Sequence, residues 1–203
     1  MSRSQNFKTD NRRTTVANEA ARMIQEHGLS DFRFAKEKAV ERLGLKRNGA
    51  LPSNQEVEFA LAERNRIFKG QTHLSQVKRL REAALIAMNS LNVFNARLAG
   101  PVLSGNATEH SRIDLHLFTD SQESVAIALT ALEIDHRSVQ IRHQFRRRQP
   151  EQYPGYRFNL DESEFSATVF PELLRRYSPL SQVDGRPMER AGIRELERLL
   201  SES

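Results

Sequence analysis

Residues 103–118 read Leu-Ser-Gly-Asn-Ala-Thr-Glu-His-Ser-Arg-Ile-Asp-Leu-His-Leu-Phe, and helical spacing gives way to extended structure here. A short apolar run from Pro101 ends in a turn of small residues at Gly105 and Asn106. Residues 113–118 then alternate apolar and polar side chains, as a strand does. Because Asp114 and His116 are two residues apart, a strand would point both side chains to one face. We expect a strand, a turn and a second strand presenting this pair.

Such a pair beside a glycine turn suits a metal ion and a phosphate. Backbone N–H groups at Gly105 and Asn106 would face the anion, and Asp114 and His116 would bind a divalent ion. Asp114 is therefore the candidate catalytic residue, and the metal is Mg²⁺ or Mn²⁺. One Asp and one His make a poor magnesium cage, and a His ligand favours Mn²⁺ or Zn²⁺. The same two residues also fit the polar face of an ordinary half-exposed strand.

Upstream of this stretch the apolar residues follow helical spacing. Residues 1–13 are basic with little apolar content, and we expect a disordered tail there. A first helix is expected from about Thr14 to His27 and a second ending at Gly44. A capping box at Ser53 and Glu56 opens a third, to about residue 68, and a fourth is expected over about 72–98. The expected organisation is a helical region over 14–70 and a domain over 71–203.

Downstream, strands are expected at 138–146, 156–160 and 165–170, where apolar side chains alternate with polar ones. Helices are expected after Asp120, around 171–177 and over 188–200. The expected fold class is therefore α+β, with an N-terminal helical region followed by a small mixed β-sheet with flanking helices.

With these residues in place, the chain resembles the polymerase-beta-type nucleotidyltransferase superfamily over about residues 72–170. That family shows an apolar strand, a Gly-Ser turn, a strand carrying Asp-apolar-Asp and a third carboxylate on a later strand. Here Asn106 stands at the serine position, His116 stands for the second acid, and Ser166 aligns best with the third. Glu162 or Glu164 fits only after an even shift of register. The resemblance implies a nucleotidyltransferase-like fold with a degenerate active site.

The whole chain also resembles a group of nucleotidyltransferase-like bacterial proteins. The matching stretches are residues 28–32, 51–56 and 178–188. The resemblance implies binding of a nucleotide or phosphorylated substrate, either without turnover or with transfer on an unusual metal set. Asp114 would then hold the metal, and Arg146 or Arg186 would face the developing charge.

Arg146 and Arg186 each also have a simpler structural interpretation. Arg142 and Arg146 share one face of the strand at 138–146, followed by Arg147 and Arg148. With Tyr153 and Tyr156 this cluster fits phosphate contacts and base stacking, but edge strands also use charge to avoid pairing. Arg186 lies in a Pro/Gly loop over 178–187, where it would point at the site or pair with Asp184.

The chain has 203 residues, no Cys and a formal net charge of +5. The first hundred residues hold 18 Lys and Arg against 10 Asp and Glu, and the remainder holds 13 against 16. The basic half supports an alternative function, a non-enzymatic nucleic-acid-binding or protein-interaction module. Without cysteine there is no disulfide framework or thiolate site. We expect no membrane span and, because the N-terminus lacks a signal-peptide pattern, a cytoplasmic location.

Overall fold

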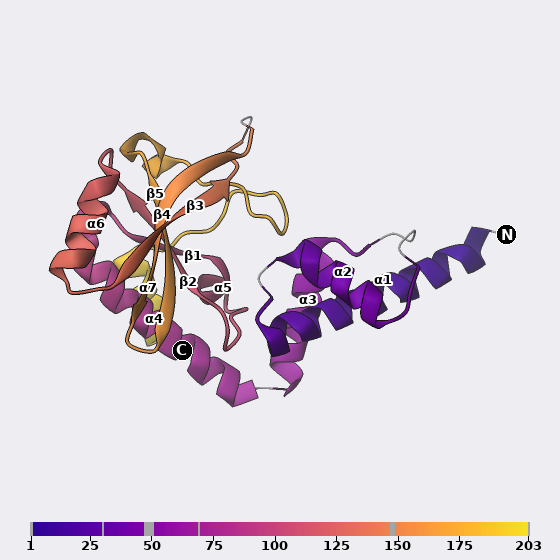
Figure 1. Ribbon diagram of the computed structural model, residues 1–203. Helices are drawn as coiled ribbons and strands as arrows, with labels where there is room; N and C mark the ends of the chain where they lie inside the picture. The colour runs from indigo at the N-terminus through magenta and orange to yellow at the C-terminus, as the bar shows by residue number, and fades with distance from the viewer. Residues whose placement is uncertain (1, 30, 47–50, 69, 147–148, 203) are drawn as a thin grey trace. The chain divides into compact units, whose positions relative to one another are not determined.

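The computed structural model describes all residues except 1, 30, 47–50, 69, 147–148 and 203, and for residues 2–10 and 68 only the backbone. The chain divides into two compact units (Figure 1). The first comprises residues 1–73 with 108–110 and 182–184, and the second comprises 74–107, 111–181 and 185–203. Each unit is described by itself.

The first unit is built from α1 (Ser2–His27), α2 (Phe32–Arg42) and α3 (Asn54–Phe68). Small and β-branched side chains let the helices pack closely, and this core comprises Val16, Ala17, Ala20, Ala21, Ile24, Ala35, Ala39, Val40, Val57, Ala60 and Leu61. The predicted capping box is confirmed. The Glu56 N–H donates to Ser53 Oγ at 3.1 Å, and the Ser53 N–H donates to Glu56 Oε2 at 2.7 Å.

The expectation of a disordered tail over residues 1–13 is corrected, because α1 begins at Ser2 and not near Thr14. No Gly or Pro interrupts residues 2–27, so nothing in the sequence breaks the helix there. Arg13 also ties this segment to the rest of the unit, since its guanidinium pairs with Glu56 at 2.7 Å. The low apolar content of residues 1–13 therefore did not predict where the helix begins.

The second unit contains a five-stranded mixed sheet in the order β1-β2-β5-β4-β3. Its strands are β1 (Arg97–Ala99), β2 (Ile113–Phe118), β3 (His136–His143), β4 (Glu151–Leu160) and β5 (Ser163–Phe170). β2 and β5 are parallel, and the other neighbouring strands are antiparallel. Together with the flanking helices, the sheet confirms the expected α+β class.

One face of the sheet carries the apolar core of the second unit, and α4 (Gly70–Ser90), α6 (Gln122–Ala131) and α7 (Ile193–Ser201) pack on it (Figure 1). The alternation of β2 explains this, because Ile113, Leu115 and Leu117 all point to that face and are fully buried. Their partners from β4 and β5 are Tyr156, Phe158, Phe165, Ala167 and Val169. The other face carries polar side chains together with the rings of Phe118, Tyr153 and Phe170.

Two expected elements near residue 100 are wrong. The helix expected over 72–98 ends at Ser90; a 3₁₀ turn, η1 (Asn92–Phe94), and β1 follow it. The strand expected before Gly105 is a short helix, α5 (Gly100–Ser104), with Pro101 in its first turn. Proline has no N–H for a sheet ladder and is pre-set for a first helical turn, which explains the difference. A second 3₁₀ turn, η2 (Glu172–Arg176), follows β5.

Within the described part of the chain, no helix is long and apolar enough to cross a membrane.

Candidate functional site on the polar face of the sheet

The sheet face opposite the apolar core carries two rows of residues, which we call the polar face. Residues in register on neighbouring strands project to the same side. One row runs across the sheet through Ala99, Asp114, Ser166, Arg157 and Arg137, and the next runs through Arg97, His116, Thr168, Gly155 and Val139. The polar face thus brings one carboxylate, one imidazole, two hydroxyls and several guanidinium groups together.

Asp114 is the acid of this face, and its carboxylate is held in a desolvated place. Gly100 has a φ of +70°, and a Cβ atom there would lie 2.6 Å from Oδ2 of Asp114. The backbone between β1 and α5 therefore covers the carboxylate closely, which only glycine permits. Burial raises the pKa of Asp114 to about 6, although the charges of Arg112 and Arg157 oppose the rise. A carboxyl group with this pKa exchanges a proton near neutral pH.

Two arginines lie near Asp114, and they differ in their partners. Arg112 is held by Glu164, with Nε 2.7 Å from Oε1. Arg157 projects from β4 on the polar face, and its Nε is buried without a hydrogen-bond partner in the described structure. Because a buried donor without an acceptor is costly, the Arg157 guanidinium is the group here that an anionic ligand would satisfy.

His116 is 1% exposed and lies among rings. Its ring centroid is 5.4 Å from that of His143 and 5.0 Å from that of Phe170. Nδ1 of His116 is buried without a partner, whereas Nε2 of His143 lies 3.1 Å from Oγ1 of Thr168. Burial first, and then the charges of His143 and Arg190, lower the pKa of His116 well below its usual value, so this imidazole is neutral at pH 7.

The glycine turn expected to hold phosphate comes directly after the short helix α5. Gly105 is the left-handed C-cap of α5, and a Cβ there would approach only Arg81. Arg81 donates to the carbonyls of Val102 and Leu103 at the end of α5. Gly100, five residues before the expected turn begins, is the glycine that contacts Asp114. Asn106 follows Gly105 directly after α5.

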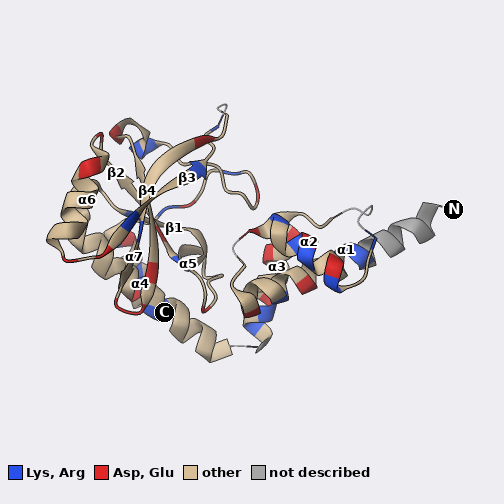
Figure 2. Ribbon diagram, viewed as in Figure 1, with Lys and Arg blue, Asp and Glu red and all other residues tan. Residues whose placement is uncertain are grey.

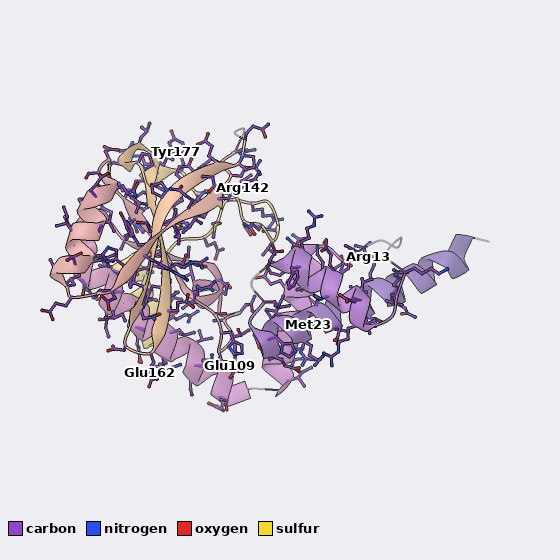
Figure 3. All side chains as sticks on the ribbon, viewed as in Figure 1. Arg13, Met23, Glu109, Arg142, Glu162 and Tyr177 are labelled. Carbon is purple, nitrogen blue, oxygen red and sulfur yellow. The ribbon has the colours of Figure 1, made fainter. Side chains whose placement is uncertain are left out.

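The arginines singled out from the sequence are not on the polar face. Arg142 is exposed and in register with Gln152, on the opposite face from His143, and Arg146 is exposed beyond the end of β3 (Figure 3). Arg186 is exposed in the loop before α7, where its carbonyl accepts a hydrogen bond from the Ser181 N–H. Arg147 and Arg148 lie outside the described residues. Tyr153 and Tyr156 are buried, so neither ring offers a stacking surface.

The third acid of the expected site is also placed by the sheet. Ser166, the position that the family resemblance matches to the third acid, is in register with Asp114. Glu164 lies two residues earlier on the same face and is paired with Arg112. Glu162 is at the β4–β5 turn, at the other end of the sheet from Arg142, and pairs with Arg79 at 3.1 Å (Figure 3).

This donor set does not fit a divalent metal. Among the described residues no three His, Cys, Asp or Glu side chains gather around one point. Asp114 is a single carboxylate whose ionised form is destabilised by burial, and an arginine cation lies beside it. Magnesium needs several hard oxygen ligands, and the two-metal arrangement needs more than one carboxylate. Anion binding and proton transfer are the chemistry that these side chains supply.

Sequence reasoning missed Arg97, Gly100, Arg157 and Arg190. Arg157 had a usable signal, because it is the only charged residue in the largely apolar stretch 153–160. Arg97 and Arg190 were hidden because both were assigned to helices. Gly100 is recognisable only from its positive φ and its contact with Asp114.

The cations of the first unit are interspersed with carboxylates. Basic and acidic residues both occur along each of α1, α2 and α3 (Figure 2). The cations that pair with carboxylates within this unit are Arg13, Arg22, Arg33, Lys38, Arg42, Arg64 and Arg66. Among the described side chains of this unit, most cations therefore have a carboxylate partner.

Comparison of the chain with protein-family models, curated proteins and solved structures finds no match to any of them.

Proposed function

We propose that the second unit is a nucleotidyltransferase-like module that binds a nucleotide or another phosphate ester on the polar face, beside Asp114 and Arg157. The observation that carries the proposal is the buried, unpartnered Nε of Arg157 in the same cross-strand row as Asp114 and Ser166. An arginine fork matches phosphate oxygens, and the Ser166 hydroxyl adds a donor. The metal set of a conventional nucleotidyl transfer is not part of this proposal.

A transfer reaction on this face would use Asp114 as a proton acceptor. Its pKa of about 6 leaves it mostly ionised at pH 7.5 and able to take a proton from an acceptor hydroxyl. The Arg157 guanidinium would then stabilise charge on the phosphoryl oxygens. Incubation with labelled nucleoside triphosphates and candidate acceptors tests this step. A product formed equally well by wild type and Asp114→Asn would remove Asp114 from the chemistry.

Binding is tested by titration calorimetry with the four nucleoside triphosphates, in chelator and again with Mg²⁺ or Mn²⁺. We expect Arg157→Gln to weaken binding about tenfold or more, since a lost charged hydrogen bond is worth about 1.5–3 kcal/mol. Arg142→Gln is the matched control, because Arg142 is an exposed arginine on the opposite face of the sheet, and it should bind as wild type does. Binding that is absent in the wild type, or equal in both variants, would overturn the proposal.

A further inference from the structure

Three basic side chains gather at the β1 edge of the polar face, and we call Arg97, His116 and Arg190 the edge cluster. Arg97 of β1 is in register with His116 of β2. Leu98 and Ala191 exchange two backbone hydrogen bonds of 2.9 Å, so residues 190–192 run beside β1 as a short extra strand. This pairing places Arg190 and Gly192 on the same face as Arg97. A Cβ at Gly192 would collide with the Arg97 guanidinium.

The edge cluster holds one buried donor and one buried imidazole nitrogen that lack hydrogen-bond partners among the described residues. Nη1 of Arg190 and Nδ1 of His116 are both buried without a hydrogen-bond partner. Nη2 of Arg190 donates to the Arg175 carbonyl at 3.0 Å, and the guanidinium lies 5.3 Å from the centre of the Phe118 ring. These contacts fix the side chain and leave one edge of the fork unused. No described carboxylate forms an ion pair with Arg97 or Arg190.

The cluster is electrostatically unfavourable as it stands. Burial and the nearby charge of Arg97 lower the pKa of Arg190 from its usual value. Two guanidinium groups held together in a partly desolvated place repel each other, and an anion between them would offset that cost. The chain itself supplies no such anion among its described residues.

We infer that the edge cluster is an anion subsite that takes a phosphate group, free or as the phosphoryl end of a larger ligand, without a metal ion. Two arginine forks match the several oxygens of a tetrahedral oxyanion better than they match the two oxygens of a carboxylate. The subsite adjoins the row of Asp114 and Arg157 but uses different residues. The phosphate subsite can therefore be tested independently of the proposed nucleotide site.

Titration of the full chain with inorganic phosphate in the presence of chelator tests the subsite. We expect saturable binding that Arg97→Gln weakens about tenfold, while the exposed control Arg142→Gln binds as wild type does. Gly192→Ala is the second variant, since its backbone φ of −81° accepts alanine while the added methyl displaces the Arg97 guanidinium. It should weaken phosphate binding with every charge retained. Thermal unfolding of each variant shows that the fold is intact.

The outcomes are distinct. Wild-type protein that binds no phosphate, or phosphate affinity unchanged in both Arg97→Gln and Gly192→Ala, overturns the subsite. Arg157→Gln should leave inorganic phosphate binding unchanged, so the result for the proposed nucleotide site is measured independently. A nucleoside triphosphate that competes with phosphate in the wild type identifies the phosphoryl end of a larger ligand as the occupant. Absence of competition identifies free phosphate.

Discussion

At the scale of single residues, Asp114 is the group that we propose as the proton acceptor of the polar face. Its carboxylate is covered by the backbone at Gly100, and the resulting desolvation outweighs the attraction of Arg112 and Arg157. The folded state therefore keeps the proton of Asp114 over a pH range in which the unfolded chain has lost it. Such a group opposes folding once it is ionised, so its presence indicates a role other than stability.

We expect Asp114→Asn to stabilise the second unit at pH 8. The wild type loses stability as the pH rises from about 4 to about 6, because the pKa of Asp114 is raised to about 6 in the folded state. The amide has no such titration, so the gain should be about 1–3 kcal/mol at pH 8 and should vanish near pH 4. Chemical denaturation at both pH values measures it. A variant that is less stable than wild type at pH 8 would contradict the desolvated carboxylate.

At the scale of elements, the parallel pairing of β2 with β5 builds the site. It sets Asp114 opposite Ser166 and His116 opposite Thr168. The alternation of residues 113–118 and 165–170 was visible in the sequence, so both strands were predictable. Only the family resemblance pointed to Ser166, and the register came from the structure. β1 was not, because three residues are too few for a period, and neither was α5, whose apolar run fits strand and helix alike. The site was therefore half predictable: its acid was found and its arginines were not.

His143 of β3 lies against a buried apolar cluster that comprises Phe118, Phe145, Tyr153, Phe170 and Leu174. Burial lowers the pKa of His143 to about 4. As the pH falls, the unfolded chain therefore binds a proton at His143 near pH 6.5, whereas the folded state binds it only near pH 4. Stability must fall as the pH drops through that window.

His143→Phe should reduce this acid-induced loss of stability. Phenylalanine keeps a ring against Phe170 and removes the proton, although it gives up the contact with Thr168. The slope of the unfolding free energy between pH 6.5 and 4 should therefore be shallower in the variant, as measured by denaturation at several pH values. His116 is present in both proteins, so its own contribution to the pH dependence of the unfolding free energy remains in both. An equal slope in wild type and variant would show that His143 is not a neutral group of the fold.

At the scale of the whole molecule, the net charge of +5 has a different meaning from the one it first suggested. Most described cations of the first unit face carboxylates within that unit. The second half is slightly acidic in composition, yet its polar face gathers arginines around one carboxylate. We therefore propose a small anionic ligand, rather than a nucleic acid, as the partner of this face.

We expect weak nucleic-acid binding from this arrangement. At 150 mM NaCl, labelled RNA and DNA should show dissociation constants no tighter than about 1 μM, the non-specific range. Fluorescence anisotropy measures this, with a repeat at 20 mM NaCl as the control for probe quality. Nanomolar binding that weakens when Arg22 and Arg42 are replaced by Gln would restore the nucleic-acid alternative.

The most direct test of the polar face as a phosphate-binding site is a titration followed by the Nε–Hε nuclear magnetic resonance signals of the arginines. We predict that a nucleoside triphosphate shifts the Arg157 signal, whose Nε has no partner in the free protein, and leaves the Arg142 signal in place. A ligand that binds while the Arg157 signal stays unchanged would contradict the account.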